Sequence, residues 1–102
     1  MIGAGQMDWK NKKVLVAGSG KSGIGAADLL KKVGADIVIY DGNEKINKGD
    51  VLAKLQNADN VEVIIGELSK EVINSVNLMI LSPGIAIDAP FVNEVRDAGV
   101  PI

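Results

Sequence analysis

Short apolar runs alternate with longer segments of helical periodicity along most of this chain. The apolar runs are rich in Val, Ile and Leu, and glycine, proline or polar residues bound them. A continuous apolar run of four or five residues is typical of a strand that is buried on both faces. The pattern predicts four strands, at residues 14–17, 37–40, 61–65 and 78–81, of which only the third is interrupted by a charged residue, Glu62.

The segment after the first predicted strand has the spacing of an amphipathic helix over residues 22–33. Gly34 follows it, and glycine tolerates the left-handed backbone with which many helices end. The apolar positions of this predicted helix recur every third residue and would face the sheet. They are Ile24, Ala27, Leu30 and Val33.

Three shorter helices are predicted between and after the remaining strands. We expect one at residues 50–55 with Asp50 as its N-cap, and one at residues 70–75 capped by Ser69. The last, at residues 90–98, has a proline in its first turn, where a missing N–H costs nothing. Strands that alternate with helices in this way indicate βαβ units and a parallel sheet.

Residues 100–102 resemble the opening of a fifth strand, because they follow a helix and Gly99 as the second strand follows Gly34. The pattern therefore predicts a single α/β domain, a Rossmann-like doubly wound parallel sheet of about five strands in the order 3-2-1-4-5. In such a sheet the ligand crevice lies at the carboxyl ends of strands one and four. We also expect the chain to be the N-terminal part of a larger protein.

The stretch VLVAGSGKSG, residues 14–23, contains two phosphate-binding signatures. GKS at residues 20–22 is similar to the end of a Walker A loop, but that loop needs a glycine where this chain has Leu15, inside the predicted strand. The second signature, GxGxxG, fits a turn that follows a strand and opens a helix. Its glycines are Gly18, Gly20 and Gly23.

A helix start offers unpaired N–H groups and a partial positive charge, so the second signature predicts a phosphate site. Lys21 and Ser22 would add a cation and a hydroxyl at the same rim. The alternative is that the glycines only form a tight turn and that Lys21 is a solvated lysine.

Two further polar segments follow predicted strands that end at the same edge. Asp41 follows the turn by about 20 residues, the spacing at which dinucleotide-binding domains carry a ribose-binding acid. It could equally cap its own turn with Asn43, and Ser82-Pro83-Gly84 could merely end a strand. The candidate site residues are Ser19, Gly20, Lys21, Ser22, Gly23, Asp41, Gly42, Asn43, Ser82, Pro83 and Gly84.

Composition narrows the possible functions. The 102 residues carry a net charge of −2 with scattered lysines, which argues against nucleic acid as a partner. The absence of Cys and His excludes disulfides, a thiol nucleophile and a Ser-His-Asp triad, and it removes the usual zinc ligands. No apolar run reaches the roughly 18 residues of a membrane span, so we expect a cytoplasmic protein with no membrane partner. Residues 1–7 read as a leader that ends at the natural start Met7, and Trp9 as a cover over the open end of the core.

Three stretches together resemble the N-terminal domain of the Mur ligases, most closely those that add D-glutamate. They are VLVAGSGKSG, IVIYD and LMILSPGIAIDAPFVNEVRDAGVPI, within a resemblance that runs from about residue 8 to residue 102. It implies that the domain binds the UDP moiety of UDP-N-acetylmuramoyl-L-alanine for peptidoglycan synthesis. Residues 20–23 would then meet the pyrophosphate and ribose, residues 41–43 the uracil, and residues 82–84 the pocket wall. Lys21 is a departure, since related turns often carry an apolar residue there.

The resemblance also implies what other parts of the enzyme would supply. A central domain would bind ATP and magnesium, a third domain would bind the incoming amino acid, and these 102 residues alone would be inactive. We therefore expect no cofactor, no metal and no catalytic residue in this chain, and we expect the missing domains as its partners. Two alternatives come from other classes: an NAD(P)-binding domain of a dehydrogenase or regulatory protein, and a module whose glycines serve packing only.

Overall fold

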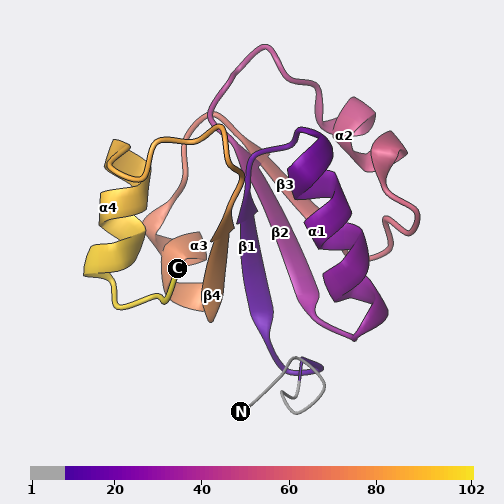
Figure 1. Cartoon of the computed structure of the whole chain (residues 1–102), viewed down its shortest axis with the longest axis horizontal. Coiled ribbons are helices and arrows are strands. Elements are labelled where there is room, and N and C mark those ends of the chain that lie inside the picture. The colour runs from indigo at the N-terminus through magenta and orange to yellow at the C-terminus, as the bar shows by residue number, and fades with distance from the viewer. Residues whose placement is uncertain (1–8) are drawn as a thin grey trace.

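The computed structural model is a four-stranded parallel sheet with two helices on each face (Figure 1), and it describes residues 9–102. The predictions of a leader over residues 1–7 and of Met7 as the start lie outside this range. The strands are β1 Lys13–Ala17, β2 Asp36–Asp41, β3 Glu62–Ile65 and β4 Leu78–Leu81. The helices are α1 Lys21–Lys32, α2 Lys48–Lys54, α3 Lys70–Ser75 and α4 Pro90–Asp97.

The strand order β3-β2-β1-β4 confirms the predicted order of the first four strands. In the parallel register Val16 of β1 lies opposite Ile39 of β2 and Ile80 of β4. The central strand β1 is fully buried from Val14 to Ala17 because helices cover both faces of the sheet. This burial explains why the strand is a continuous apolar run.

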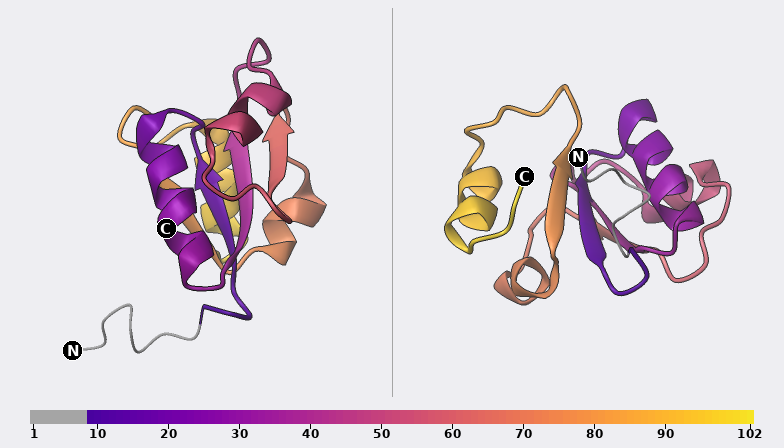
Figure 2. Two further views of the ribbon diagram at one scale, coloured as in Figure 1. Left: turned by 90° about the vertical axis from the view of Figure 1, so that its right-hand side faces the viewer. Right: turned by 60° about the horizontal axis from the view of Figure 1, so that its bottom comes forward.

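Each face of the sheet packs against its own pair of helices, and Figure 2 shows the two layers on opposite sides. Val14, Val16 and Ile39 pack with residues of α1 and α2, on what we call the α1–α2 face. Leu15 and Val38 pack with residues of α3 and α4, on the α3–α4 face. The connections from β1 to β2 and from β2 to β3 therefore cross one face, and the connection from β3 to β4 crosses the other, so that β4 pairs with β1 on the side away from β2.

The predicted face of α1 is correct for three of its four apolar positions. Ile24, Ala27 and Leu30 are buried, but Val33 lies beyond the last helical residue and is 45% exposed. Gly34, at φ +92°, ends the helix in the left-handed region, as expected. Val33 misses the sheet because the chain turns away at this cap.

The predicted cap of the second helix was wrong. Asn47, not Asp50, is the N-cap of α2, and its side chain accepts a hydrogen bond from the amide of Asp50 at 3.2 Å. The helix therefore starts at Lys48. Asp50 lies in the first turn, where a negative charge favours the helix dipole. The prediction for Ser69 is confirmed, since its hydroxyl accepts from the amide of Val72.

A fifth strand is not formed within residues 9–102. The segment after α4 does lie beside the edge strand β4, because the amide of Met79 donates to the carbonyl of Pro101 at 2.9 Å. A parallel ladder needs further bonds on both sides of this one. Trp9, at the opposite end of the chain, is partly buried against the core of the α1–α2 face, as expected of a cover.

Candidate functional site

Three polar segments meet at the carboxyl edge of the sheet, and we call them together the mouth. They are residues 18–23 after β1, residues 41–43 at the end of β2, and residues 82–84 after β4. Backbone hydrogen bonds join two of these segments to the ends of neighbouring strands: Gly18 N donates to Tyr40 O of β2 at 2.7 Å, and Ser82 N donates to Ala17 O of β1 at 3.0 Å. The structure thus brings together the segments predicted from sequence.

Glycine is required at two positions of the mouth. Gly18 has φ +108°, and a Cβ added there would lie 2.5 Å from Ser82 Oγ. A Cβ at Gly23 would overlap the carbonyl oxygen of Gly18, so α1 can pack this closely on β1 only without a side chain. Gly18 is thus needed for the turn and Gly23 for close packing of the helix on the strand. Gly20 has open space around its Cβ position, so the fold itself does not require glycine there.

The start of α1 presents donors to this mouth. The first helical hydrogen bond runs from Ile24 N to Gly20 O at 2.9 Å, so the amides of Lys21, Ser22 and Gly23 precede the helical ladder. Gly20 provides no side-chain cap, and no acidic residue lies in the first turn. Lys21 and Ser22 are exposed at the rim. Such a helix start favours an anion by about 0.3–1 kcal/mol at exposed sites.

Asp41 joins the first two segments of the mouth. It is the last residue of β2, and its Oδ2 accepts from the hydroxyl of Ser19 at 2.6 Å and from the amide of Ser19 at 3.1 Å. Its Oδ1 accepts from the amide of Asn43 at 2.9 Å. Turn capping is therefore one role of Asp41, and a ligand contact stays a prediction.

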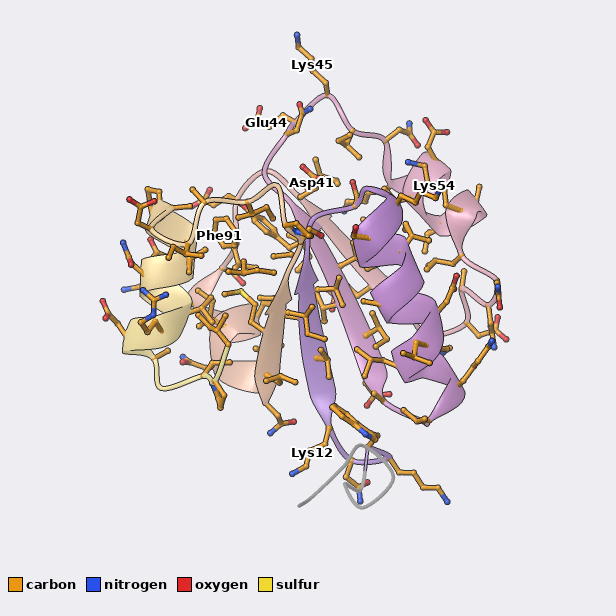
Figure 3. The ribbon with its side chains drawn as sticks, viewed as in Figure 1. Lys12, Asp41, Glu44, Lys45, Lys54 and Phe91 are labelled. Atoms are coloured by element: carbon orange, nitrogen blue, oxygen red, sulfur yellow. The ribbon has the colours of Figure 1, made fainter. Side chains whose placement is uncertain are left out.

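The charge of Asp41 is stabilised where it stands. Partial burial by itself would raise the pKa of this carboxyl, but hydrogen bonds from the Ser19 hydroxyl and from the amides of Asn43 and Ser19 outweigh it. Together with the positive charge of Lys54 they hold the pKa of Asp41 below its ordinary value. Asp41 is thus a carboxylate at neutral pH. Figure 3 shows it at the upper edge of the sheet, with Lys54 to its right on α2 and Lys12 at the opposite edge.

The third segment ends β4 and turns toward α4. Ile85 N donates to Ser82 O at 3.0 Å, which closes the turn around Pro83 and Gly84, so the predicted strand termination is confirmed. Pro83 and Gly84 are exposed at the mouth. The hydroxyl oxygen of Ser82 is buried and has no hydrogen-bond partner within residues 9–102. A buried polar atom without a partner is costly, and it often marks a place where a ligand or water binds.

An acidic hollow of about 370 Å³ adjoins the mouth on the α3–α4 face. Tyr40 forms part of its lining, its hydroxyl donates to Gly66 O at 2.6 Å, and its ring lies 5.0 Å from that of Phe91. Burial raises the pKa of Tyr40, and the negative charges of Asp41, Glu94 and Glu67 add to this effect. Carboxylates disfavour a phosphate in this hollow, so the start of α1 is the more suitable anion site.

A second hollow of about 370 Å³ lies between α3 and α4, away from all three segments of the mouth. Its lining includes Lys70, Ile73, Glu94 and Asp97. Neither hollow is lined by any of the candidate site residues predicted from the sequence. The sequence did not reveal three features of the mouth. They are the hydrogen bonds between Ser19 and Asp41, the effect of the Lys54 charge on Asp41, and the lack of a partner for the Ser82 hydroxyl. Only the position of Ser19 between two glycines gave any signal for them.

No helix in the described part of the chain is long and apolar enough to cross a membrane. The polar groups of the mouth are backbone amides, the ammonium of Lys21, the carboxylate of Asp41, the side-chain amide of Asn43 and three serine hydroxyls. These groups can bind an anion and read the hydrogen-bonding edge of a polar ligand beside it.

Comparison with known proteins covers almost the whole chain. A family described as "Mur ligase MurD-like, N-terminal domain" matches residues 12–102. Three similar relatives are each named "UDP-N-acetylmuramoylalanine--D-glutamate ligase". The protein of Lachnospira eligens is 50% identical over 97 residues, which are 94% of this chain and 21% of the relative. That of Lachnoclostridium phytofermentans is 43% identical over 96 residues, 94% of this chain and 21% of the relative. That of Ligilactobacillus salivarius is 39% identical over 94 residues, 92% of this chain and 20% of the relative. The chain thus spans about a fifth of the length of these relatives.

Proposed function

Because this chain belongs to the Mur ligase family, as a MurD-like N-terminal domain, we propose that its mouth binds the UDP moiety of UDP-N-acetylmuramoyl-L-alanine. The relatives are named for a ligase that acts on UDP-N-acetylmuramoylalanine and D-glutamate. The whole protein would then catalyse this ligation in peptidoglycan synthesis, in the cytoplasm. The observation that carries the proposal is the row of amides of Lys21, Ser22 and Gly23 ahead of the first helical hydrogen bond.

The geometry supports a division of the ligand among the three segments. The amides at the start of α1 suit the diphosphate, because they combine donors with the positive end of the helix dipole. Residues 41–43 lie beside this turn and offer a carboxylate and exposed backbone to the uracil. Ser82 Oγ, buried and unpartnered, and the exposed Pro83 and Gly84 form the remaining wall.

This part of the enzyme binds and orients, and we propose that it carries no catalytic residue. ATP and magnesium would be held by other parts of the full-length enzyme. The turn between β1 and α1 would bind the diphosphate of the substrate. The NAD(P) alternative gains no support from the relatives above, which are named as ligases and not as dehydrogenases.

We also propose that residues 100–102 begin a fifth strand beside β4 in the longer protein. The hydrogen bond from Met79 N to Pro101 O is the contact that supports it, because it has the direction of a first rung on the free edge of β4. Burial of Val100 against the core fixes the entry of this segment.

Calorimetric titration of the purified chain tests the proposed ligand. We expect UDP and UDP-N-acetylmuramoyl-L-alanine to bind, with modest affinity because the rest of the substrate would contact other domains, and we expect no response to NAD. Gly20→Ala is a suitable variant, because its methyl enters open space in the fold but blocks the approach to the helix start. Binding of NAD without a response to UDP would contradict the proposal.

A further inference from the structure

Ser19 uses its side-chain and backbone donors inside the protein. Only 3% of Ser19 is exposed to solvent, and both its hydroxyl and its amide donate to Oδ2 of Asp41, at 2.6 and 3.1 Å. The adjacent amide of Gly18 donates to Tyr40 O at 2.7 Å. Two consecutive residues of the turn are thus fixed to the last two residues of β2.

Asp41 is itself held on several sides. Its Oδ1 accepts from Asn43 N at 2.9 Å, and its carbonyl accepts from Gly66 N at 2.8 Å, so both its side chain and its backbone are anchored. A carboxylate at this position opposes a nearby phosphate by charge repulsion. Whatever Asp41 contributes to a diphosphate site must therefore come from positioning and not from its charge.

We propose that Ser19 and Asp41 form a clasp that positions the β1–α1 turn for the diphosphate, an inference that rests on the function proposed above. The clasp fixes the turn just before Gly20, so that the amides of Lys21, Ser22 and Gly23 are oriented before the ligand arrives. Preorganised donors bind more tightly because less conformational freedom is lost on binding. Both clasp residues are positioning residues, and the part of the ligand that they affect is the phosphate.

The clasp makes a prediction that a direct contact of Asp41 with the nucleoside does not make. If Asp41 acted only on uracil or ribose, its neutralisation would leave the affinity for inorganic pyrophosphate unchanged, or would raise it by removing a negative charge. If Asp41 acts through Ser19, the same change weakens pyrophosphate. The two roles therefore differ for a ligand that carries no nucleoside: only the clasp predicts a loss of affinity.

The test compares Ser19→Ala and Asp41→Asn with the wild-type chain, using inorganic pyrophosphate and UDP as separate probes. Amide shifts of residues 20–23 in NMR titrations give the dissociation constants. We expect each variant to weaken both probes about three- to tenfold, because the amides of the turn are then no longer ordered before the ligand binds. The double variant should lose less than the product of the two single effects, because both changes break the same clasp.

Ser75→Ala is the matched control. It also removes one serine hydroxyl, which donates to Val72 O at 2.7 Å on α3, outside the mouth, and it should leave both affinities unchanged. Ser19→Ala is the smaller of the two clasp changes, so it remains informative if Asp41→Asn fails to fold. A purely structural clasp would lower the melting temperature of Ser19→Ala without changing either dissociation constant, and this result would overturn the inference. A wild-type chain that binds neither probe would instead contradict the proposed function itself.

Discussion

The mouth contains two buried serine hydroxyls, and their surroundings are opposite. Ser19 Oγ lies after β1 and donates to Asp41 at 2.6 Å, whereas Ser82 Oγ lies after β4 and has no partner within residues 9–102. Both lie just after the carboxyl end of a strand, Ser19 within the glycine-rich turn and Ser82 against Gly18 of the same turn. The first hydroxyl therefore helps to hold the turn in place, whereas under the function proposed above the second is available to a ligand.

A substitution in the glycine-rich turn should have the largest effect on stability. In Gly23→Ala the new methyl would overlap the carbonyl oxygen of Gly18, so α1 must move away from β1. We expect a loss of about 3 kcal/mol or more in the free energy of unfolding, measured by urea titration. Gly20→Ala is the control, because its Cβ meets nothing within 4 Å and the poorer N-cap should cost only about 0.5–1 kcal/mol. Equal stabilities of the two variants would show that the close packing is not required.

Alanine at each serine tests the comparison itself. Ser19→Ala leaves Asp41 with one donor fewer and should lower the free energy of unfolding by about 1–2 kcal/mol. Ser82→Ala removes a hydroxyl that has no partner, so it should be neutral or slightly stabilising while it weakens UDP binding. Urea unfolding gives the free energy of unfolding of each variant, and calorimetry gives its dissociation constant for UDP. A strongly destabilised Ser82→Ala would mean that its hydroxyl is satisfied in the folded chain.

The pH dependence of stability is the smallest expected effect. The pKa of Asp41 is lowered in the folded chain from its ordinary value of 3.8, so its contribution is fully present above that pH and is lost as the pH falls through the folded pKa. The stability difference between wild type and Asp41→Asn should therefore be constant near neutrality and shrink below about pH 4. Carbon-13 NMR of the carboxyl should show a lower pKa in wild type than in Ser19→Ala. An unchanged pKa in that variant would mean that the Ser19 hydroxyl does not stabilise the charge.

Local pattern was enough to predict the first four strands, the glycine turn and the three segments of the mouth. Strand burial makes continuous apolar runs, and a close helix–strand contact requires a glycine such as Gly23, so both leave a mark in a short stretch of sequence. The order of the first four strands followed from connection rules that hold for most parallel sheets.

Features that depend on distant residues, or on the exact residue at which a helix begins or ends, were not predictable in the same way. The clasp joins Ser19 to Asp41 across 22 positions, and no local pattern distinguishes this contact from a turn cap. The N-cap of α2 was misplaced because the polar segment before it offers both Asn47 and Asp50, and only the backbone conformation selects one. Val33 has the right spacing for the core but lies at a cap, where periodicity no longer applies.

Amide mapping of the chain with UDP tests the central claim most directly. In a nitrogen-15 NMR titration we expect the largest shifts at residues 20–23, then at residues 41–43 and 82–84, with little change around the acidic hollow beside Tyr40. Shifts centred on that hollow, or none at the start of α1, would contradict the assignment of the mouth as the diphosphate site.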